Sequence, residues 1–222
     1  MDKALTSRFP EDIVPIKSLD EGLFVMELWH GRTYTFKDLG MAGVAQLMNY
    51  FLAKRQKRCI PIILTSGDTG SAAIDSLHDS EHADIIVLYP SNGRISRVQE
   101  LQMITYPDKN VHVFAADGNA DEFCPVLQRF MQDEEFSKKH MICAMNSLNV
   151  VRILIQTVHF IYGYLRVCKR IGETVRFIVP TGGAGNITGE KQVSVVTCLP
   201  GCFPNSIEVR KLQLLQLSNR PT

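Results

Sequence analysis

From residue 41 to residue 179 the sequence alternates between helix-like and strand-like runs, and this alternation is the feature that most restricts its fold. Such an order is typical of a parallel sheet that carries helices on both faces, so an α/β fold is predicted. The strand-like runs are short, apolar and rich in β-branched residues, at 60–64, 85–89, 111–115 and 175–179. The helix-like runs lie between and beside them, at 41–57, 71–77, 96–105, 120–133 and 148–169.

The two ends of the chain do not continue this order. A strand-like piece at 23–28 follows a short leader that contains prolines. After Gly189 the alternation requires another helix, but a short β-like run and two proline-containing turns come next. Only then does 206–217 show the pattern of an amphipathic helix. We therefore expect the doubly wound sheet to stop within a motif.

The composition restricts the class of partner. The 222 residues are 45% hydrophobic and 21% charged, which predicts one or two globular domains with a substantial core. A formal net charge of +1 favours neither a nucleic-acid partner nor an acidic scaffold. One basic cluster, at 54–58, follows a helix-like run. We interpret it as a solvated helix end, where cations complement the helix dipole, in preference to a phosphate-backbone contact.

The cysteines and the apolar runs bear on location. The six cysteines are scattered without the CxxC spacing of a zinc or redox motif, so no metal site is predicted. Cys198 and Cys202 would close a small loop only in an oxidising compartment. No apolar run is long enough to cross a bilayer, and the first ten residues lack the apolar region of a signal peptide. We expect a cytoplasmic protein without membrane contact, and unconventional secretion stays open.

A polar loop, Thr-Ser-Gly-Asp-Thr-Gly-Ser at 65–71, follows the first buried strand-like run. Its backbone N–H groups and hydroxyl groups are the convergent donors that a carboxylate needs. The binding residues that we expect here are Thr65, Ser66, Gly67, Asp68, Thr69 and Gly70. The alternative is structural, with Asp68 as the N-cap of the next helix.

A glycine-rich loop, Pro-Thr-Gly-Gly-Ala-Gly-Asn at 180–186, follows the last strand-like run. Glycines allow close backbone approach, and N–H groups at a helix start bind anions, so a phosphate cradle is predicted. Its residues are Gly182, Gly183, Ala184, Gly185 and Asn186. The spacing fits neither GxxxxGK[ST] nor GxGxxG, and a plain tight turn is the alternative.

Lys37 ends the segment Glu-Leu-Trp-His-Gly-Arg-Thr-Tyr-Thr-Phe-Lys, which begins at residue 27. An amine flanked by aromatic residues can be desolvated, which lowers its pKa and permits a Schiff base with an aldehyde. The structural alternative is an exposed lysine at a helix start that pairs with Asp38. Pyridoxal phosphate supplies an aldehyde and a phosphate, and its amino-acid substrates supply a carboxylate. One amine and two anion-binding loops therefore predict this cofactor.

Five segments carry a further resemblance in their order along the chain. They are 27–38, 65–73, Gln-Glu-Leu-Gln-Met at 99–103, Asn-Ser-Leu-Asn at 146–149 and Val-Pro-Thr-Gly-Gly-Ala-Gly-Asn at 179–186. Together they resemble threonine synthases, with the animal threonine synthase-like branch closest, over roughly residues 23 to 189. The resemblance implies a truncated pyridoxal-phosphate fold of type II, similar to the tryptophan synthase β chain.

The resemblance also implies roles for particular residues. Lys37 would bind the cofactor covalently and move the substrate α-proton, the loop at 65–70 would hold the substrate carboxylate, and 182–186 would hold the cofactor phosphate. Asn146 and Asn149 match a motif beside the pocket, and both also suit a helix cap. Gln99 and Gln102 are expected to be surface or packing residues of a small domain.

The implied chemistry is loss of phosphate from an O-phosphorylated amino acid of the phosphothreonine or phosphohomoserine class. A lyase that releases ammonia and a 2-oxo acid is favoured over a synthase. Four segments are expected. They are 1–40 with the lysine motif, 41–145 as a small α/β domain, 146–189 as part of a large domain that ends in the phosphate loop, and 190–222 as a tail outside the family, derived from an alternative exon or an intron.

The resemblance implies that such a chain would lack parts of the fold that catalysis uses, so a second function stays open. This is a non-catalytic short isoform that acts as a regulatory, binding or secreted signalling protein. A sheet that stops early exposes a strand edge and a core face. A homo-oligomer, or a protein partner that covers this face, is therefore expected, as is a small phosphorylated amino acid as ligand.

Overall fold

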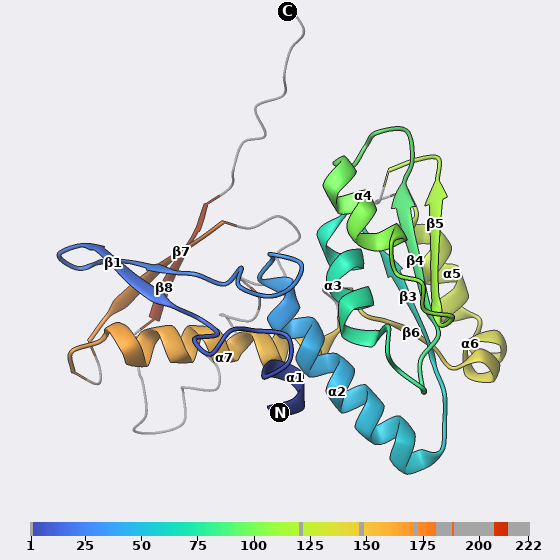
Figure 1. The fold of residues 1–222 in the computed structure, drawn as a ribbon, viewed down its shortest axis with the longest axis horizontal. Coiled ribbons are helices and arrows are strands. Elements are labelled where there is room, and N and C mark those ends of the chain that lie inside the picture. The colour runs from blue at the N-terminus through green and yellow to red at the C-terminus, as the bar shows by residue number, and fades with distance from the viewer. Residues whose placement is uncertain are drawn as a thin grey trace, which may run out of the picture.

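The structure is a computed structural model that describes residues 2–119, 122–146, 149–170, 173–180, 188 and 207–212 (Figure 1). Its helices are α1 (Asp2–Leu5), α2 (Lys37–Arg55), α3 (Asp68–Leu77), α4 (Arg97–Ile104), α5 (Cys124–Gln132), α6 (Glu134–His140) and α7 (Val150–Val167). Its strands are β1 (Ile16–Asp20), β2 (Leu23–Met26), β3 (Ile60–Leu64), β4 (Ile85–Pro90), β5 (Val111–Ala116), β6 (Ile142–Ala144), β7 (Val175–Pro180) and β8 (Ile207–Leu212).

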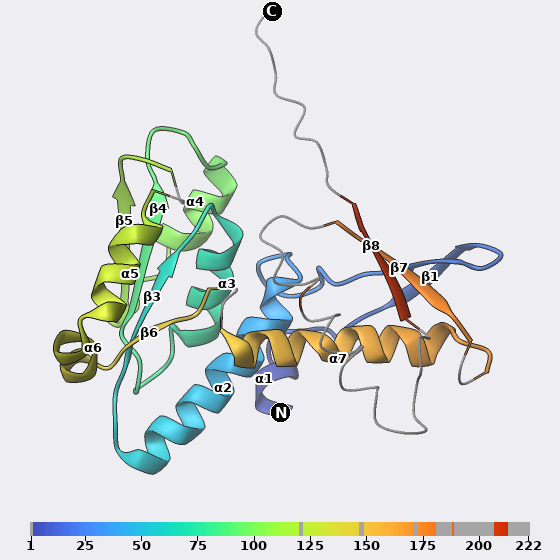
Figure 2. The same ribbon diagram turned by 180° about the vertical axis from the view of Figure 1, so that it is seen from behind.

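The largest sheet has four strands in the order β5-β4-β3-β6, and all its pairings are parallel. Helices α3 and α5 lie on opposite sides of it in both Figure 1 and Figure 2. The expected parallel α/β sheet with helices on both faces is confirmed. Because the strands run in one direction, the loops that follow them meet at one edge of the sheet, where ligands bind in open α/β folds.

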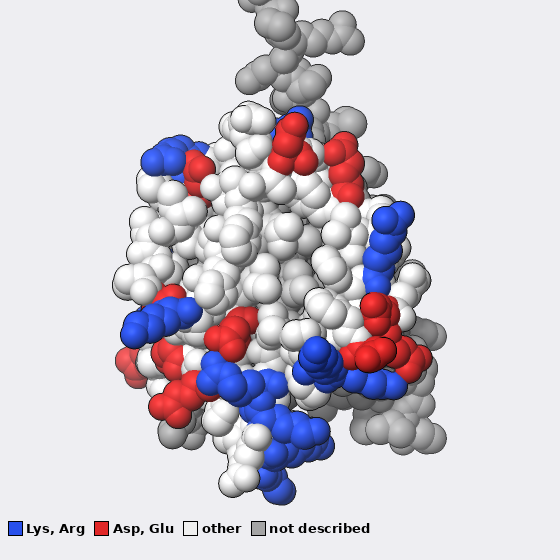
Figure 3. Space-filling view, turned by 90° about the vertical axis from the view of Figure 1, so that its right-hand side faces the viewer, with Lys and Arg blue, Asp and Glu red and all other residues white. Residues whose placement is uncertain are grey.

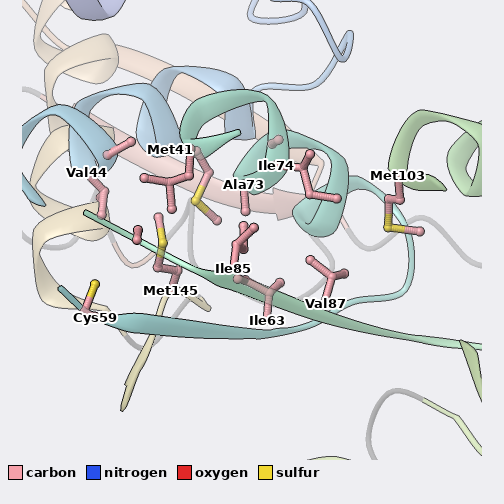
Figure 4. Packing of buried hydrophobic residues seen from close by; sticks show 14 of the residues in the cluster. Met41, Val44, Cys59, Ile63, Ala73, Ile74, Ile85, Val87, Met103 and Met145 are labelled. Atoms are coloured by element: carbon pink, nitrogen blue, oxygen red, sulfur yellow. The ribbon is translucent and has the colours of Figure 1, made fainter. Parts of the chain in front are cut away.

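The hydrophobic core fills the space between this sheet and helices α2 and α3 (Figure 4). Met41 of α2, Ile63 of β3, Ile74 of α3 and Ile85 of β4 are fully buried there. Burying a side chain of this size contributes about 1.5–3 kcal/mol. The core therefore fixes the start of α3 relative to α2, and both starts carry candidate site residues.

Helix α7 crosses α2 at close range. A Cβ atom on Gly43 would lie 2.7 Å from Ile155 Cδ1, and one on Gly40 would lie 3.4 Å from Arg152 Cγ. Glycine at these positions lets the two helix backbones approach. The first turns of α2 are consequently packed against the first half of α7.

Two smaller sheets lie outside the central one. Strands β1 and β2 form an antiparallel pair, and β7 pairs in parallel with β8 from Val175–Ile207 to Pro180–Leu212. The amphipathic helix expected at 206–217 is wrong for Ile207–Leu212, which is strand β8. Extended pairing with β7 has overridden the weak helical pattern of this segment.

Helix boundaries also differ from the sequence expectation. Helix α2 begins at Lys37 instead of residue 41, and α3 begins at Asp68 instead of residue 71. The single helix expected at 120–133 ends before Asp133, which caps a further helix by accepting a hydrogen bond from Phe136 N at 3.0 Å. Local capping chemistry decided this break.

The surface carries charges of both signs. Figure 3 shows Lys and Arg side chains gathered at the lower end of the face that it draws, while acidic side chains lie among the other basic ones. Lys54 and Arg55 are exposed in the last turn of α2, where cations complement the helix dipole. Among the described residues, no helix combines the length and the apolar character needed to cross a membrane.

Candidate functional site

The loop before Lys37 is held by the carboxylate of Asp38. This carboxylate accepts hydrogen bonds from Thr33 N at 3.0 Å and from the Thr33 hydroxyl. A Cβ atom on Gly31 would overlap Asp38, so the loop needs glycine there. Burial raises the pKa of Asp38, and the bonds from Thr33 oppose that shift. The loop therefore delivers Lys37 to a defined place at the start of α2.

Lys37 Nζ lies 2.9 Å from Asp68 Oδ2, and its side chain is 20% exposed. The ammonium group also lies 5.4 Å from the centre of the Phe36 ring, whereas the Tyr34 side chain is 76% exposed. The alternative of an exposed lysine paired with Asp38 is therefore wrong. Lys37 and Asp68 are the first residues of α2 and α3, so two helix starts meet at this ion pair.

The polar loop after β3 is closed by Thr65. Its hydroxyl oxygen accepts hydrogen bonds from Gly67 N and Gly70 N, each at 2.9 Å. These two N–H groups are bonded within the loop, so a ligand would have to use other donors there. Ser66 is exposed and Thr69 is half-buried. Thr65 shapes the loop, which leaves Ser66 and Thr69 as the hydroxyl groups nearer to solvent.

Gly67 is the N-cap of α3 and has a φ of 132°, a backbone conformation that favours glycine. No side-chain hydrogen bond caps this helix, so the alternative role of Asp68 as its N-cap is wrong. Gly70 is equally confined, because a Cβ atom there would lie 2.5 Å from Met103 Sδ. The two glycines allow the loop to pack closely against α4.

Gln99 contacts the site, which sequence reasoning missed. Its Nε2 atom donates to Asp68 Oδ1 at 2.6 Å. Burial alone would raise the pKa of Asp68, but the bond from Gln99 and the charge of Lys37 together lower it. The carboxylate is thus held ionised between an amide and an ammonium group. The Ser96-x-x-Gln99 spacing is typical of a capping box, and this pattern could have indicated that the Gln99 side chain has a fixed orientation.

The start of α7 brings a buried cation close to α2. Arg152 is 4% exposed, burial lowers its pKa to about 10, and its Nη1 atom donates to Met145 O at 3.3 Å. Among the described residues it has no acidic partner within ion-pair distance. The side-chain amide of Gln156 is buried without a hydrogen-bond partner in the described part of the chain. Such groups destabilise a fold unless a ligand or another segment satisfies them.

The two asparagines of the 146–149 segment have structural contacts. Asn149 caps α7 by accepting a hydrogen bond from Arg152 N at 3.2 Å. Asn146 donates to Leu64 O at 2.7 Å and so ties this segment to the end of β3. The cap interpretation is therefore confirmed for Asn149. The expected phosphate cradle, Gly182 to Asn186, lies outside the described residues, as do Cys198 and Cys202.

Curated proteins resemble this chain in sequence over most of its length. Over 190 residues the chain is 50% identical to threonine synthase-like 2 of Xenopus laevis, a match that covers 85% of this chain and 40% of that protein. The chain is therefore similar in sequence to threonine synthase-like proteins over most of its own length. It spans about 40% of the length of the curated relatives that it matches. No family model matches it.

The chain shares its fold with parts of solved threonine synthases. The enzyme from Brucella melitensis with bound pyridoxal phosphate has a TM-score of 0.75 and 34% identity, over 86% of this chain and 40% of that chain. The yeast enzyme has a TM-score of 0.76 and 30% identity, over 95% of this chain and 42% of that chain. The expected kinship with pyridoxal-phosphate-dependent threonine synthases is therefore confirmed.

Of the two reactive groups of pyridoxal phosphate, the aldehyde and the phosphate, the described residues fit the aldehyde. Lys37 provides a mostly buried primary amine, which is the group that bonds an aldehyde. It lies where the starts of two helices meet, and helix starts favour anions. The Lys37 amine and the two helix starts are therefore the features there that suit an aldehyde-bearing anion.

Proposed function

We propose that this chain binds pyridoxal phosphate through Lys37 and acts as a phospho-lyase. The substrate class that we propose is an O-phosphorylated amino acid, such as phosphothreonine or phosphohomoserine. The observation that carries this proposal is the Lys37 amine, mostly buried and held 2.9 Å from Asp68 between two helix starts. A lysine of purely structural role is usually exposed at its amine.

Each group has a distinct role in this proposal. When bound, pyridoxal phosphate would supply an electron sink that stabilises negative charge at the substrate α-carbon. Lys37 Nζ would hold the cofactor and move the α-proton, and Asp68 would orient the lysine side chain. Ser66 and Thr69 would supply hydroxyl donors for the substrate carboxylate. Gly182 to Asn186 remain our proposed residues for the cofactor phosphate.

Arg152 supports a substrate that carries phosphate. It is a buried guanidinium without an acidic partner among the described residues, and it packs against Gly40, one helical turn beyond Lys37. Arginine recognises phosphate by paired hydrogen bonds, and an anion here would offset the cost of its burial. The departing phosphate of the substrate is the anion that the proposed chemistry requires.

The first test is covalent trapping at Lys37. The purified chain is mixed with pyridoxal phosphate, its visible absorption is recorded, and borohydride reduction is followed by peptide mapping. We expect the label on Lys37, its loss in Lys37→Ala, and phosphate release from phosphothreonine by the wild-type chain. Label spread over surface lysines, or no label, would overturn the proposal.

A second test concerns Arg152 and needs no cofactor. Inorganic phosphate is titrated while the melting temperature is followed, with Arg152→Met beside the wild type. We expect phosphate to stabilise the wild type, because a ligand of the folded state raises its stability by mass action, and to leave Arg152→Met unchanged. Equal stabilisation of both chains would remove Arg152 from the phosphate site.

One feature favours a second function, in which the chain acts through protein contact. Helix α7 exposes apolar side chains along one side, including Val150, Leu154, Val158 and Leu165. An apolar surface of this kind marks an interaction site in many soluble proteins. We propose a homo-oligomer or a protein partner on this side of α7. A partner whose binding survives Lys37→Ala would favour this role over catalysis.

A further inference from the structure

We propose that Gln99 of α4 is a positioning residue, which sets the Asp68 carboxylate against the Lys37 ammonium group. Its meaning for catalysis rests on the function proposed above, but the contacts that carry it are present in the free chain. Helix α4 would then control the geometry of the lysine without touching the substrate. Gln99 would then have a role at the site, whereas the sequence predicted only a surface or packing residue.

The side-chain amide of Gln99 is bonded at both ends. Its Oε1 atom accepts from Ser96 N at 3.1 Å and from the Ser96 hydroxyl at 3.0 Å, while its Nε2 atom donates to Asp68 Oδ1 at 2.6 Å. A flipped amide would set two acceptors against each other at Asp68 and two donors at Ser96 N. The capping box of α4 therefore aims the NH₂ group of Gln99 at Asp68.

The loop is shaped to admit this amide. A Cβ atom on Gly67 would lie 2.5 Å from Gln99 Cδ and 2.6 Å from its Nε2 atom. The space that any other residue would fill at position 67 is therefore occupied by the Gln99 side chain. Glycine at this position serves both the backbone turn and the approach of α4.

Helix α4 makes further contacts on both sides of the lysine. Gln102 Nε2 donates to Thr33 O at 3.5 Å, in the loop that leads to Lys37. Met103 is fully buried and lies against Gly70, in the loop that carries Asp68. One face of α4 thus contacts both segments that meet at the ion pair. A change in the position of α4 would move Asp68 relative to Lys37.

The charge balance at Asp68 gives Gln99 a second effect. Burial of this carboxyl opposes its ionised form, and Gln99 and Lys37 are the groups that favour that form. An ionised carboxylate with a fixed position directs an ammonium group more strongly than a mobile one, because a charge-assisted hydrogen bond depends on its geometry. Removing the Gln99 donor should both loosen Asp68 and make its protonation easier.

The test uses two pairs of variants. They separate the loss of the Gln99 amide donor from the effect of an added negative charge on α4 and from the loss of the Ser96–Gln99 capping box. Gln99→Glu keeps an acceptor for the capping box but places a carboxylate beside Asp68. Its control is Val98→Glu, which adds the same charge at an exposed neighbouring position of α4. Gln99→Leu removes donor and cap together, and its control is Ser96→Ala, which weakens the cap and keeps the amide.

The first readout is the pKa of the Asp68 carboxyl in the chain without cofactor, followed by carbon NMR with Asp68→Asn for assignment. We expect it to rise in both Gln99 variants and to stay near the wild-type value in both controls. The second readout is the rate at which borohydride traps pyridoxal phosphate on Lys37. Misplacement of the lysine should slow trapping about tenfold in the Gln99 variants only.

The possible outcomes separate the two proposals. An Asp68 pKa that is the same in each Gln99 variant and its control would overturn the role of Gln99. So would equal trapping rates on Lys37 in all five chains. If wild-type Lys37 is never trapped, the proposed function fails, while the Asp68 titration still decides the role of Gln99.

Discussion

Helices α3 and α7 differ in whether the polar groups that they bury have hydrogen-bond partners. Helix α3 buries eight of its ten residues, among them Ile74 and Leu77 in the main core. Helix α7 also buries apolar side chains, Phe160 and Tyr164, but its buried side includes Arg152 and Gln156, which carry atoms without a hydrogen-bond partner in the described part of the chain. On its other side, Leu154 is 49% exposed and Val158 is 57% exposed. A helix that packs only for stability turns its apolar side inward. The difference indicates that α3 is a satisfied packing element of the core, whereas α7 buries polar groups that lack partners among the described residues.

The largest effect should come from the apolar packing of α3. Ile74→Ala leaves a cavity in the main core and should lower the free energy of unfolding by about 2–5 kcal/mol. Leu154→Ala on α7 is the matched change at a half-exposed position, where less than about 1 kcal/mol is expected because little packing is lost. Urea denaturation measures both, and equal losses would break the contrast between the helices.

An effect of opposite sign should come from the buried polar side of α7. The amide of Gln156 has no hydrogen-bond partner among the described residues and is 1% exposed. Gln156→Leu should therefore stabilise the chain by about 1–3 kcal/mol, the cost of an unsatisfied buried group. The matched change in α3 is Ser76→Ala, which removes a hydroxyl bonded to Ala72 O at 2.8 Å. Ser76→Ala should not stabilise the chain. A lower free energy of unfolding in Gln156→Leu would show that the Gln156 amide is not an unsatisfied group.

A smaller effect is expected at the start of α7, with the start of α3 as its comparison. Asn149→Ala removes the side-chain cap of α7 and should lower the free energy of unfolding by about 1 kcal/mol. At the corresponding position of α3, Gly67→Ala removes no cap. It forces alanine into a positive φ and places its Cβ atom against Gln99, and the backbone strain alone costs about 1–3 kcal/mol. Thermal melts compare the two, and Asn149→Asp should restore the α7 cap.

The smallest effect concerns pH. The pKa of Asp68 is lower in the folded chain than its ordinary value, so Asp68 contributes stability above the ordinary pKa that is lost as the pH falls through the folded value. This side chain is 42% exposed, and solvent screening keeps the effect small. Asp68→Asn should flatten the acid limb of a plot of stability against pH. An unchanged acid limb would show that the ion pair contributes no stability.

Much of the central fold could be predicted from local pattern. Strand β3 has the predicted limits 60–64, and β4, β5 and β7 each extend one residue beyond theirs. Runs of apolar and β-branched residues bounded by turns carry this information. In the central strands β3 and β4, burial in a parallel sheet accounts for residues that are apolar throughout. The start of α2 was missed, since Phe36, its N-cap, makes no side-chain cap hydrogen bond. Strand β8 was missed because pairing with a distant strand decides it.

The sequence by itself determined the order of strands and helices, the candidate lysine and the polar loop that faces it. These follow from composition and spacing over a few residues, which local propensities and turn chemistry control. Only the tertiary structure decided that Lys37 pairs with Asp68, that Gln99 reaches the same carboxylate and that α7 turns Arg152 inward. The Lys37–Asp68 and Gln99–Asp68 contacts each join residues that are 31 positions apart. Arg152 of α7 lies against Gly40 of α2, so each of these contacts joins two different helices. Packing of the whole chain sets such contacts, and no local pattern encodes them.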